Sequence, residues 1–267
     1  RESGMIDFYL ALLAFGVLFA TCAYGLALRA GSMAIVDLVW TLLLGLGGFT
    51  YVLILQITGE ASLRSWIVFS VLFAWSFRLS GYLLRDRVRG NKEDPRYANL
   101  AKHWGSQANR NFYFLFLAQV FLATVFLVPV VHAANNPAPL GGSDVLAVGI
   151  ALLALLGETI ADKQLADFRA KPTNQGKVCV SGLWRYSRHP NYFFEWLHWW
   201  AYAAFAMTGP DAWICLIGPL LMYIFLRYVT GIPHAERSSL QHRGEAYRRY
   251  QQTTSPFFPW IPRQLPS

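Results

Sequence analysis

Long apolar runs recur along this chain, and they constrain its fold more than any other feature. A run of about 20 apolar residues can cross the hydrocarbon core of a bilayer as a helix, whereas a membrane β-barrel needs shorter strands of alternating polarity. We therefore predict an all-α, polytopic membrane protein with about seven transmembrane helices. The runs fall at about 5–28, 33–57, 65–84, 112–133, 144–166, 191–208 and 212–230.

The distribution of charge predicts the topology. Hydrophobic residues make up 55% of the chain and charged residues only 14%, which excludes an ordinary soluble domain. The formal net charge of +8 would suit nucleic acid, but the basic residues gather between the apolar runs, so we expect no nucleic-acid partner. Residues 85–110 are rich in Arg and Lys, and 135–144 contain neither. The positive-inside rule then predicts an outward N-terminus and a cytoplasmic C-terminus.

The start of the chain suggests where the folded domain begins. Arg1–Gly4 precede Met5 and do not look native, so we exclude them. The first apolar run is too long for a cleavable signal peptide, and we interpret it as the first membrane helix. We treat residues 5–267 as a single membrane-embedded domain.

A polar segment at 181–195 stands at the start of the sixth apolar run. Uncompensated polar groups there would cost several kcal/mol, so the segment is more than a connection. Pro190 suits the first turn of a helix, which would bring Asn191, Glu195 and His198 to one face. The two arginines of the segment would lie at the N-terminal end of that helix, where guanidinium and backbone N–H groups together bind phosphate. We predict a cofactor-phosphate clamp that leads into a membrane-embedded active site.

Polar residues inside two earlier runs are further candidates. Asp37 lies among apolar residues of the second run, as either an interfacial acid or a group that faces a cavity or a partner. Arg78, Tyr82 and Arg85 share one face of the third run by helical spacing. Arg85 could simply anchor the helix on the cytoplasmic side, whereas Arg78 is deeper and is expected to face a polar interior.

The end of the fifth run carries charged residues at helical spacing. Glu158, Asp162 and Arg169 would share one face if the helix continues beyond the membrane surface. They could form a salt-bridged helix end. Alternatively, the acids could accept hydrogen bonds from ribose or amide groups while the arginine meets phosphate.

Two polar regions outside the apolar runs also have predicted structure. Residues 86–111 are expected to form a cytoplasmic loop with a short interfacial helix. Residues 244–250 are expected to form an amphipathic surface helix whose basic face suits anionic lipid headgroups. The aromatic residues at 257–262 are typical of a membrane interface.

The C-terminal half of the chain resembles a known family. Residues 183–192 with Glu195, the 162–169 segment and the ending at 244–262 are similar to the steroid 5α-reductase-like membrane family, in its bacterial branch. The likeness is strong over 150–262. The Arg-His-Pro-Asn-Tyr core is also similar to sterol C14-reductases and to isoprenylcysteine carboxyl methyltransferases.

The resemblance implies a seven-helix enzyme in a bacterial inner membrane. Such an enzyme holds NADPH in the cytoplasmic half of the bundle and delivers hydride to a conjugated carbon–carbon double bond of a lipophilic substrate. Residues 5–133 would then form the substrate side and 144–262 the cofactor-binding half, with membrane lipid around both.

The resemblance also implies a set of cofactor-binding residues. Positions that match family residues contacting the dinucleotide are Asp162, Arg169, Asn191, Glu195 and Arg227. The other residues that we expect near the cofactor are Arg78, Arg85, Arg185, Tyr186, Arg188, His189, Tyr192, His234 and Glu236. His189 could be either a ligand contact or a hydrogen-bond donor at the helix start.

Reduction of an enone needs a donor at the carbonyl oxygen, where negative charge builds. In steroid reductases a glutamine–glutamate pair on the second helix and a tyrosine on the third supply it. This chain departs from that pattern, because its second run offers Asp37, and Trp75 stands near the tyrosine's place. We predict Asp37, as a protonated acid, and Tyr82 as the donors. The substrate would be a steroid or another lipophilic enone.

The alternative function is an S-adenosylmethionine-dependent methyltransferase. The Arg-His-Pro-Asn-Tyr segment would then seat the amino-acid part of the cofactor, Glu236 would assist, and Asp37 would be dispensable. The many arginines near the cytoplasmic ends of the runs exceed what a phosphate-free cofactor requires, which favours the reductase.

Metal and transport functions fit the pattern less well. Glu195 and His198 have the spacing of a di-iron carboxylate motif, but no second such pair is present. The cysteines, Cys22, Cys179 and Cys215, are isolated, so we expect neither a metal site nor a disulfide. A transporter would be expected to show an inverted repeat, and none is evident.

Overall fold

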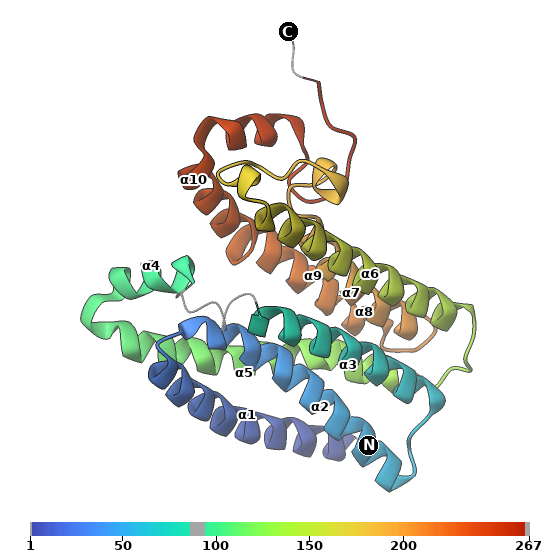
Figure 1. The fold of residues 1–267 in the computed structure, drawn as a ribbon. Helices are drawn as coiled ribbons and strands as arrows, with labels where there is room; N and C mark the ends of the chain where they lie inside the picture. The colour runs from blue at the N-terminus through green and yellow to red at the C-terminus, as the bar shows by residue number, and fades with distance from the viewer. Residues whose placement is uncertain (1, 86–93, 265–267) are drawn as a thin grey trace. The chain divides into compact units, whose positions relative to one another are not determined.

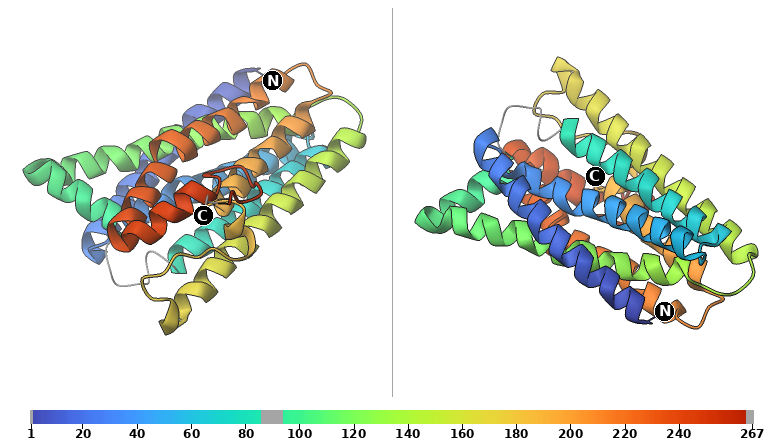
Figure 2. Two further views of the ribbon diagram at one scale, coloured as in Figure 1. Left: turned by 90° about the horizontal axis from the view of Figure 1, so that it is seen from above. Right: turned by 90° about the horizontal axis from the view of Figure 1, so that it is seen from below.

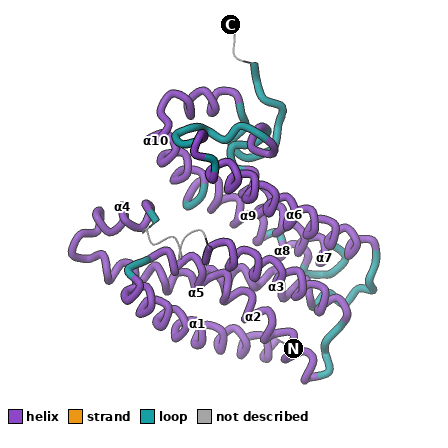
Figure 3. The backbone as a smooth tube through the Cα atoms, in the orientation of Figure 1, coloured by secondary structure: helices purple, strands orange, loops and turns teal. Residues whose placement is uncertain are grey.

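The computed structural model describes residues 2–85 and 94–264, and within these ranges it is helical with no β-strand (Figures 1 and 3). The prediction of an all-α protein is therefore confirmed. The α-helices are α1 (Glu2–Ala30), α2 (Val36–Thr58), α3 (Leu63–Leu83), α4 (Pro95–Trp104), α5 (Ala108–Ala134), α6 (Gly142–Ala170), α7 (Pro190–Ala206), α8 (Ala212–Cys215), α9 (Ile217–Ile224) and α10 (Ile232–Thr253).

Six helical stretches of the described chain are long and apolar enough to cross a membrane. They are Gly4–Ala30, Met33–Thr58, Leu63–Leu83, Arg96–Ala134, Gly142–Ala170 and Ala212–Thr253. The sixth predicted run corresponds to α7, whose 17 residues fall short of the about 20 that a span needs. The protein is thus an integral membrane protein, while a seventh span and the orientation stay predictions.

Local sequence signals explain several helix ends. Ser62 and Ser65 form a reciprocal capping box that starts α3. Asp94 caps α4 by accepting a hydrogen bond from the backbone N–H of Arg96, and Pro95 occupies the first turn. Helix α4 is the short helix that we predicted within 86–111, of which residues 86–93 lie outside the described chain.

The chain divides into two compact units. The first comprises Arg1–Ala138 and Thr208–Cys215, and the second comprises Pro139–Met207 and Leu216–Ser267. The first boundary, after Ala138, lies between the predicted segments 5–133 and 144–262, and the segment containing α8 belongs to the first unit. The substrate-side and cofactor-side roles of the two segments stay predictions.

The first unit packs α2 against α3 and α5, and α1 against α5. Small residues allow close approach of the helices. A side chain at Gly45 would run into Ser76, whose hydroxyl donates a 2.7 Å hydrogen bond to the carbonyl of Thr41. Fully buried apolar residues of this unit include Leu43, Leu44, Leu72, Trp75, Phe116 and Leu127.

The second unit is organised around the close pair α6 and α7, which lie next to each other in Figure 1 and in the left view of Figure 2. Gly157 lies directly against the ring of Phe194, so that the two backbones approach closely. Helix α9 packs on α7. Trp199, Tyr202 and Phe205 of α7 have no exposed surface.

The last apolar run differs from the single helix that we predicted over 212–230. It is divided into α8, α9 and a π-helical turn over Phe225–Val229. The polar helix after it is longer than the predicted 244–250, because it begins at Ile232. It bends at Gly244, whose φ of 49° favours glycine.

Candidate functional site

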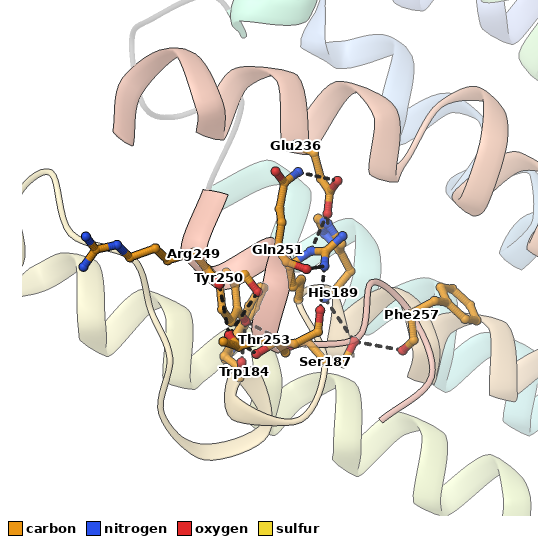
Figure 4. A network of polar contacts seen from close by, with 11 residues as sticks. Trp184, Ser187, His189, Glu236, Arg249, Tyr250, Gln251, Thr253 and Phe257 are labelled. Atoms are coloured by element: carbon orange, nitrogen blue, oxygen red, sulfur yellow. Dashed lines mark hydrogen bonds and ion pairs between the residues drawn. The ribbon is translucent and has the colours of Figure 1, made fainter. Parts of the chain in front are cut away.

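Arg188 is the centre of a buried polar network in the second unit. Figure 4 shows this network and labels its members Ser187, His189, Glu236 and Gln251. Its side chain is 8% exposed, and its Nε donates a 2.6 Å hydrogen bond to Oε1 of Glu236. Its Nη1 donates to the carbonyl of Gln251 at 3.0 Å and to that of Thr254 at 2.5 Å. The amide of Gln251 completes the network by donating to Oε2 of Glu236 at 2.9 Å. Arg188 therefore ties the residues before α7 to both ends of α10.

The segment before α7 also holds the C-terminal tail. The hydroxyl of Ser187 donates to the carbonyl of Phe257 at 2.8 Å, and the backbone N–H of Arg188 donates to the carbonyl of Ser255 at 2.8 Å. The hydroxyl of Tyr250 donates to the carbonyl of Trp184. The ring of Phe257 is 1% exposed and anchors the tail in the core.

These contacts revise the predicted role of Arg188. We expected its guanidinium to bind cofactor phosphate, but it is buried and donates to a carboxylate and two carbonyls of the chain itself. Sequence reasoning missed Gln251 as a partner of Arg188 and Tyr250 as a partner of Ser187, because both lie more than 60 residues further along the chain. The only signal available was the family likeness of both segments.

His189 is the last residue before α7 and is buried against Glu236. Its Nε2 lies 3.4 Å from Oε1 of Glu236, and its ring stacks on that of Tyr192 at 5.3 Å between centroids. Burial lowers the pKa of His189; Glu236 opposes this shift, and the charges of Arg188 and Arg227 add to it. A neutral ring donates to Glu236 through Nε2–H. His189 thus makes no side-chain cap of α7.

Acidification is expected to destabilise the protein through His189. Because its pKa is lower in the folded state than the ordinary value of about 6.5, the unfolded state binds the proton more readily between the two values. Stability is then lost as the pH falls below about 6.5. His189→Gln lacks this loss, so the difference in melting temperature between wild type and variant should narrow between about pH 7.5 and pH 5. A constant difference across this range would contradict the prediction.

A buried polar face runs along α6 and α7. Asp162 is 7% exposed and accepts a 3.2 Å hydrogen bond from the amide of Asn191. Glu195 is buried one turn beyond Asn191 and accepts from the indole of Trp199 at 3.3 Å. Nε2 of His198 lies 2.8 Å from the hydroxyl of Tyr202. The predicted helix from Pro190 is confirmed; Glu195 and His198 are buried, and Asn191 is half-buried.

Most of the other predicted cofactor residues of the second unit are exposed, whereas Arg227 is half-buried. Arg169 is exposed, although it shares the helix of the buried acids Glu158 and Asp162. Arg227 lies in the π-helical turn, 5.1 Å from the ring centroid of Tyr228. Three further residues of the set are exposed, namely Arg185, Tyr186 and His234. Among the described residues, no group of three or more His, Cys, Asp and Glu side chains could hold a metal ion.

Asp37 differs from the protonated donor that we predicted. Its Oδ2 accepts a 2.7 Å hydrogen bond from Arg96, and its Oδ1 accepts a 2.6 Å hydrogen bond from the hydroxyl of Tyr97. Arg96 also pairs with Asp94 at 2.9 Å. A carboxylate that accepts from a guanidinium and a phenol behaves as an ionised acceptor. Sequence reasoning had used Arg96 only as a topology signal.

The remaining predicted residues lie on α3 or just after it, in the first unit. Tyr82 and Arg78 are half-buried, and Trp75 is fully buried. Arg85 is exposed, and its Nε donates to the carbonyl of Gly81 at 3.3 Å. The predicted set is thus shared between the two units, and within the second unit the structure brings together the residues before and at the start of α7 with Glu236 and Arg227.

Comparison with known proteins gives a family but no close relative. No curated protein and no solved structure matches the chain. One family model matches residues 23–254 and is described as a protein of unknown function, DUF1295. Because the match covers most of the chain, the protein belongs to the DUF1295 family, a steroid 5α-reductase-like membrane family.

Proposed function

We propose that this protein is a membrane reductase that uses NADPH to reduce a conjugated carbon–carbon double bond of a lipophilic substrate. The likeness of its family to steroid 5α-reductases is the reason for proposing this class of enzyme. The observation that carries the proposal is the polar face of Asp162, Asn191 and Glu195 next to the N-terminal end of α7, in which the two acids are buried and Asn191 is half-buried. Ionisable groups inside an apolar bundle are rare and commonly mark a ligand or substrate site. We further propose a bacterial inner membrane and a cofactor site on its cytoplasmic side.

The residues of the second unit suit the parts of a dinucleotide. When bound, NADPH would supply the hydride. Asp162 and Glu195 would accept hydrogen bonds from ribose hydroxyl or carboxamide groups, and Asn191 can both donate and accept. The exposed guanidinium groups of Arg169 and Arg185 are accessible to phosphate oxygens. Arg188 would act indirectly, by holding the start of α7 in place.

A reductase of this kind also needs a donor at the substrate oxygen. We propose the phenol of Tyr82 for this role, because Asp37 already accepts hydrogen bonds from Arg96 and Tyr97. In this proposal Asp37 positions α4 through these contacts. The substrate is a steroid or another lipophilic enone.

The methyltransferase alternative is less well supported by the same contacts. It would use Glu236 to help seat S-adenosylmethionine. The carboxylate of Glu236, however, already accepts hydrogen bonds from Arg188 and Gln251 and lies beside His189. These partners leave the carboxylate little acceptor capacity for a new ligand.

Selective stabilisation by cofactor tests the proposal. NADPH at 100 times its Kd should raise the free energy of unfolding of the detergent-purified protein by about 2.7 kcal/mol, which is measured as a rise in melting temperature. NADH should stabilise less because it lacks the 2′-phosphate. Asn191→Ala should abolish the rise, whereas Asn109→Ala, the same change at an exposed site, should retain it. Stabilisation by S-adenosylmethionine alone would favour the methyltransferase, and no response to either cofactor would overturn both.

A further inference from the structure

A cluster of apolar side chains is exposed where the C-terminal tail meets the segment before α7. Trp260 is 73% exposed and Ile261 is 77% exposed. The backbone N–H of Trp260 donates a 2.9 Å hydrogen bond to the carbonyl of Tyr186, whose ring is itself exposed. We call Tyr186, Phe258, Trp260 and Ile261 the tail surface. Because this hydrogen bond joins the two segments that form it, the tail surface has a defined structure within the second unit.

The tail surface is fixed to α6 at the level where that helix changes from apolar to charged. The indole of Trp184 donates to the carbonyl of Ala161 at 2.9 Å, and the backbone N–H of Leu183 donates to Oε1 of Gln164 at 2.9 Å. Apart from Thr159, whose hydroxyl donates to the carbonyl of Leu155, the exposed face of α6 is apolar as far as Ile160 and then carries the ion pair between Lys163 and Asp167. A change of this kind marks the boundary between hydrocarbon and headgroups.

The chain around the tail surface is basic and contains no acid. Residues 168–194 and 246–267 hold eight basic residues and neither Asp nor Glu. Two of them are already paired within the protein, Arg188 with Glu236 and Arg248 with Glu245, which directly precedes the second range. Arg249 and Arg263 are exposed, and the side chain of Arg249 points away from the buried network in Figure 4. Aromatic side chains next to an excess of positive charge, at the boundary between hydrocarbon and headgroups, are suited to the anionic headgroup layer of a bilayer.

We propose that the tail surface binds the anionic phospholipids of the surrounding membrane, with Trp260 in the interface and Arg249 and Arg263 on headgroup phosphates. The proposal is independent of the reductase function, because it needs no cofactor. In addition to packing on the second unit, the tail would then contact the membrane. The segment from Trp184 to His189, which carries the candidate site, would be held at the membrane surface from its outer side.

Depth measurement at Trp260 tests the proposal directly. The full chain carrying Trp260→Cys and Cys22→Ser would be labelled with a nitroxide; the two other cysteines are buried. It would be placed in nanodiscs of phosphatidylcholine, with or without phosphatidylglycerol. The nitroxide collides more often with oxygen when it lies in the bilayer and more often with a water-soluble nickel complex when it lies in water. The ratio of these two collision rates therefore reports how deeply the label is immersed in the membrane. We expect this ratio to rise several-fold with phosphatidylglycerol, and to stay unchanged for Gln175→Cys, at an exposed loop site.

A charge variant separates lipid binding from simple burial. Arg249→Gln with Arg263→Gln changes only exposed side chains and should remove the dependence on phosphatidylglycerol without lowering the melting temperature. An equal ratio in both lipid mixtures would overturn the proposal, as would a dependence that persists in this variant. A ratio that responds to NADPH instead of phosphatidylglycerol would also overturn it, and would assign the cations to cofactor phosphate.

Discussion

Arg188→Met is expected to lower the free energy of unfolding by about 3–5 kcal/mol, because it removes one partner of a buried ion pair. The change leaves the Glu236 carboxylate without its 2.6 Å hydrogen bond and leaves the carbonyls of Gln251 and Thr254 without their donor. These buried groups would be left without hydrogen-bond partners and without access to water. Their uncompensated desolvation costs more free energy than the hydrogen bonds contribute to stability. The tail beyond Thr254 should become sensitive to protease.

Thermal unfolding in detergent measures the effect of Arg188→Met. A loss of this size corresponds to a fall in melting temperature of roughly 6–20 °C. Arg185→Met is the matched control: Arg185 lies in the same segment but is exposed, so the change should stay within about 0.5 kcal/mol. Adding Glu236→Gln to Arg188→Met should recover part of the stability, because the stranded charge is removed. Equal effects at Arg188 and Arg185 would contradict a structural role for Arg188.

Gly157→Leu is expected to cost about 3 kcal/mol or more, because it overpacks the closest contact between α6 and α7. A side chain at this position would run into the ring of Phe194, the neighbour of Glu195. The two helices could accept it only by moving apart. That movement would separate Asp162 from Asn191, which are joined at 3.2 Å, so stabilisation by NADPH should be lost as well.

The control for Gly157→Leu lies on the same helix. A side chain at Gly149 would meet nothing within 4 Å, and the residue is exposed. Gly149→Leu should therefore leave both the melting temperature and the response to NADPH close to those of wild type. If the two leucine variants behaved alike, close packing of α6 on α7 would not be what maintains the site.

Several features of the site could be predicted from local sequence. Pro190 starts α7, and the spacing of Asn191, Glu195 and His198 brings them to one inward face. Asp162 was expected beside them through the family resemblance, and it does accept from Asn191. Such predictions succeed because helical periodicity and the first-turn preference of proline depend only on residues within a few positions of each other.

The roles of the charged side chains could not be predicted in the same way. Arg185 and Arg188 looked alike in the sequence, yet one is exposed and the other is buried on Glu236. Asp37 looked like an isolated acid, but Arg96 and Tyr97 of α4 reach it from about 60 residues away. Whether a charge binds a ligand or a distant part of the chain depends on which partners the fold brings near.

The sequence by itself therefore determined the class of this protein: an all-α chain of long apolar helices, because a bilayer requires internally hydrogen-bonded spans of a fixed length. Tertiary structure alone decided how its polar groups are paired. In the folded chain Arg188 is hydrogen-bonded to Glu236 and to the carbonyl of Thr254, and Asp37 is hydrogen-bonded to Arg96 of α4. The physical reason is that hydrophobic length is a local property, whereas satisfying a buried charge needs a partner that only the folded chain can supply.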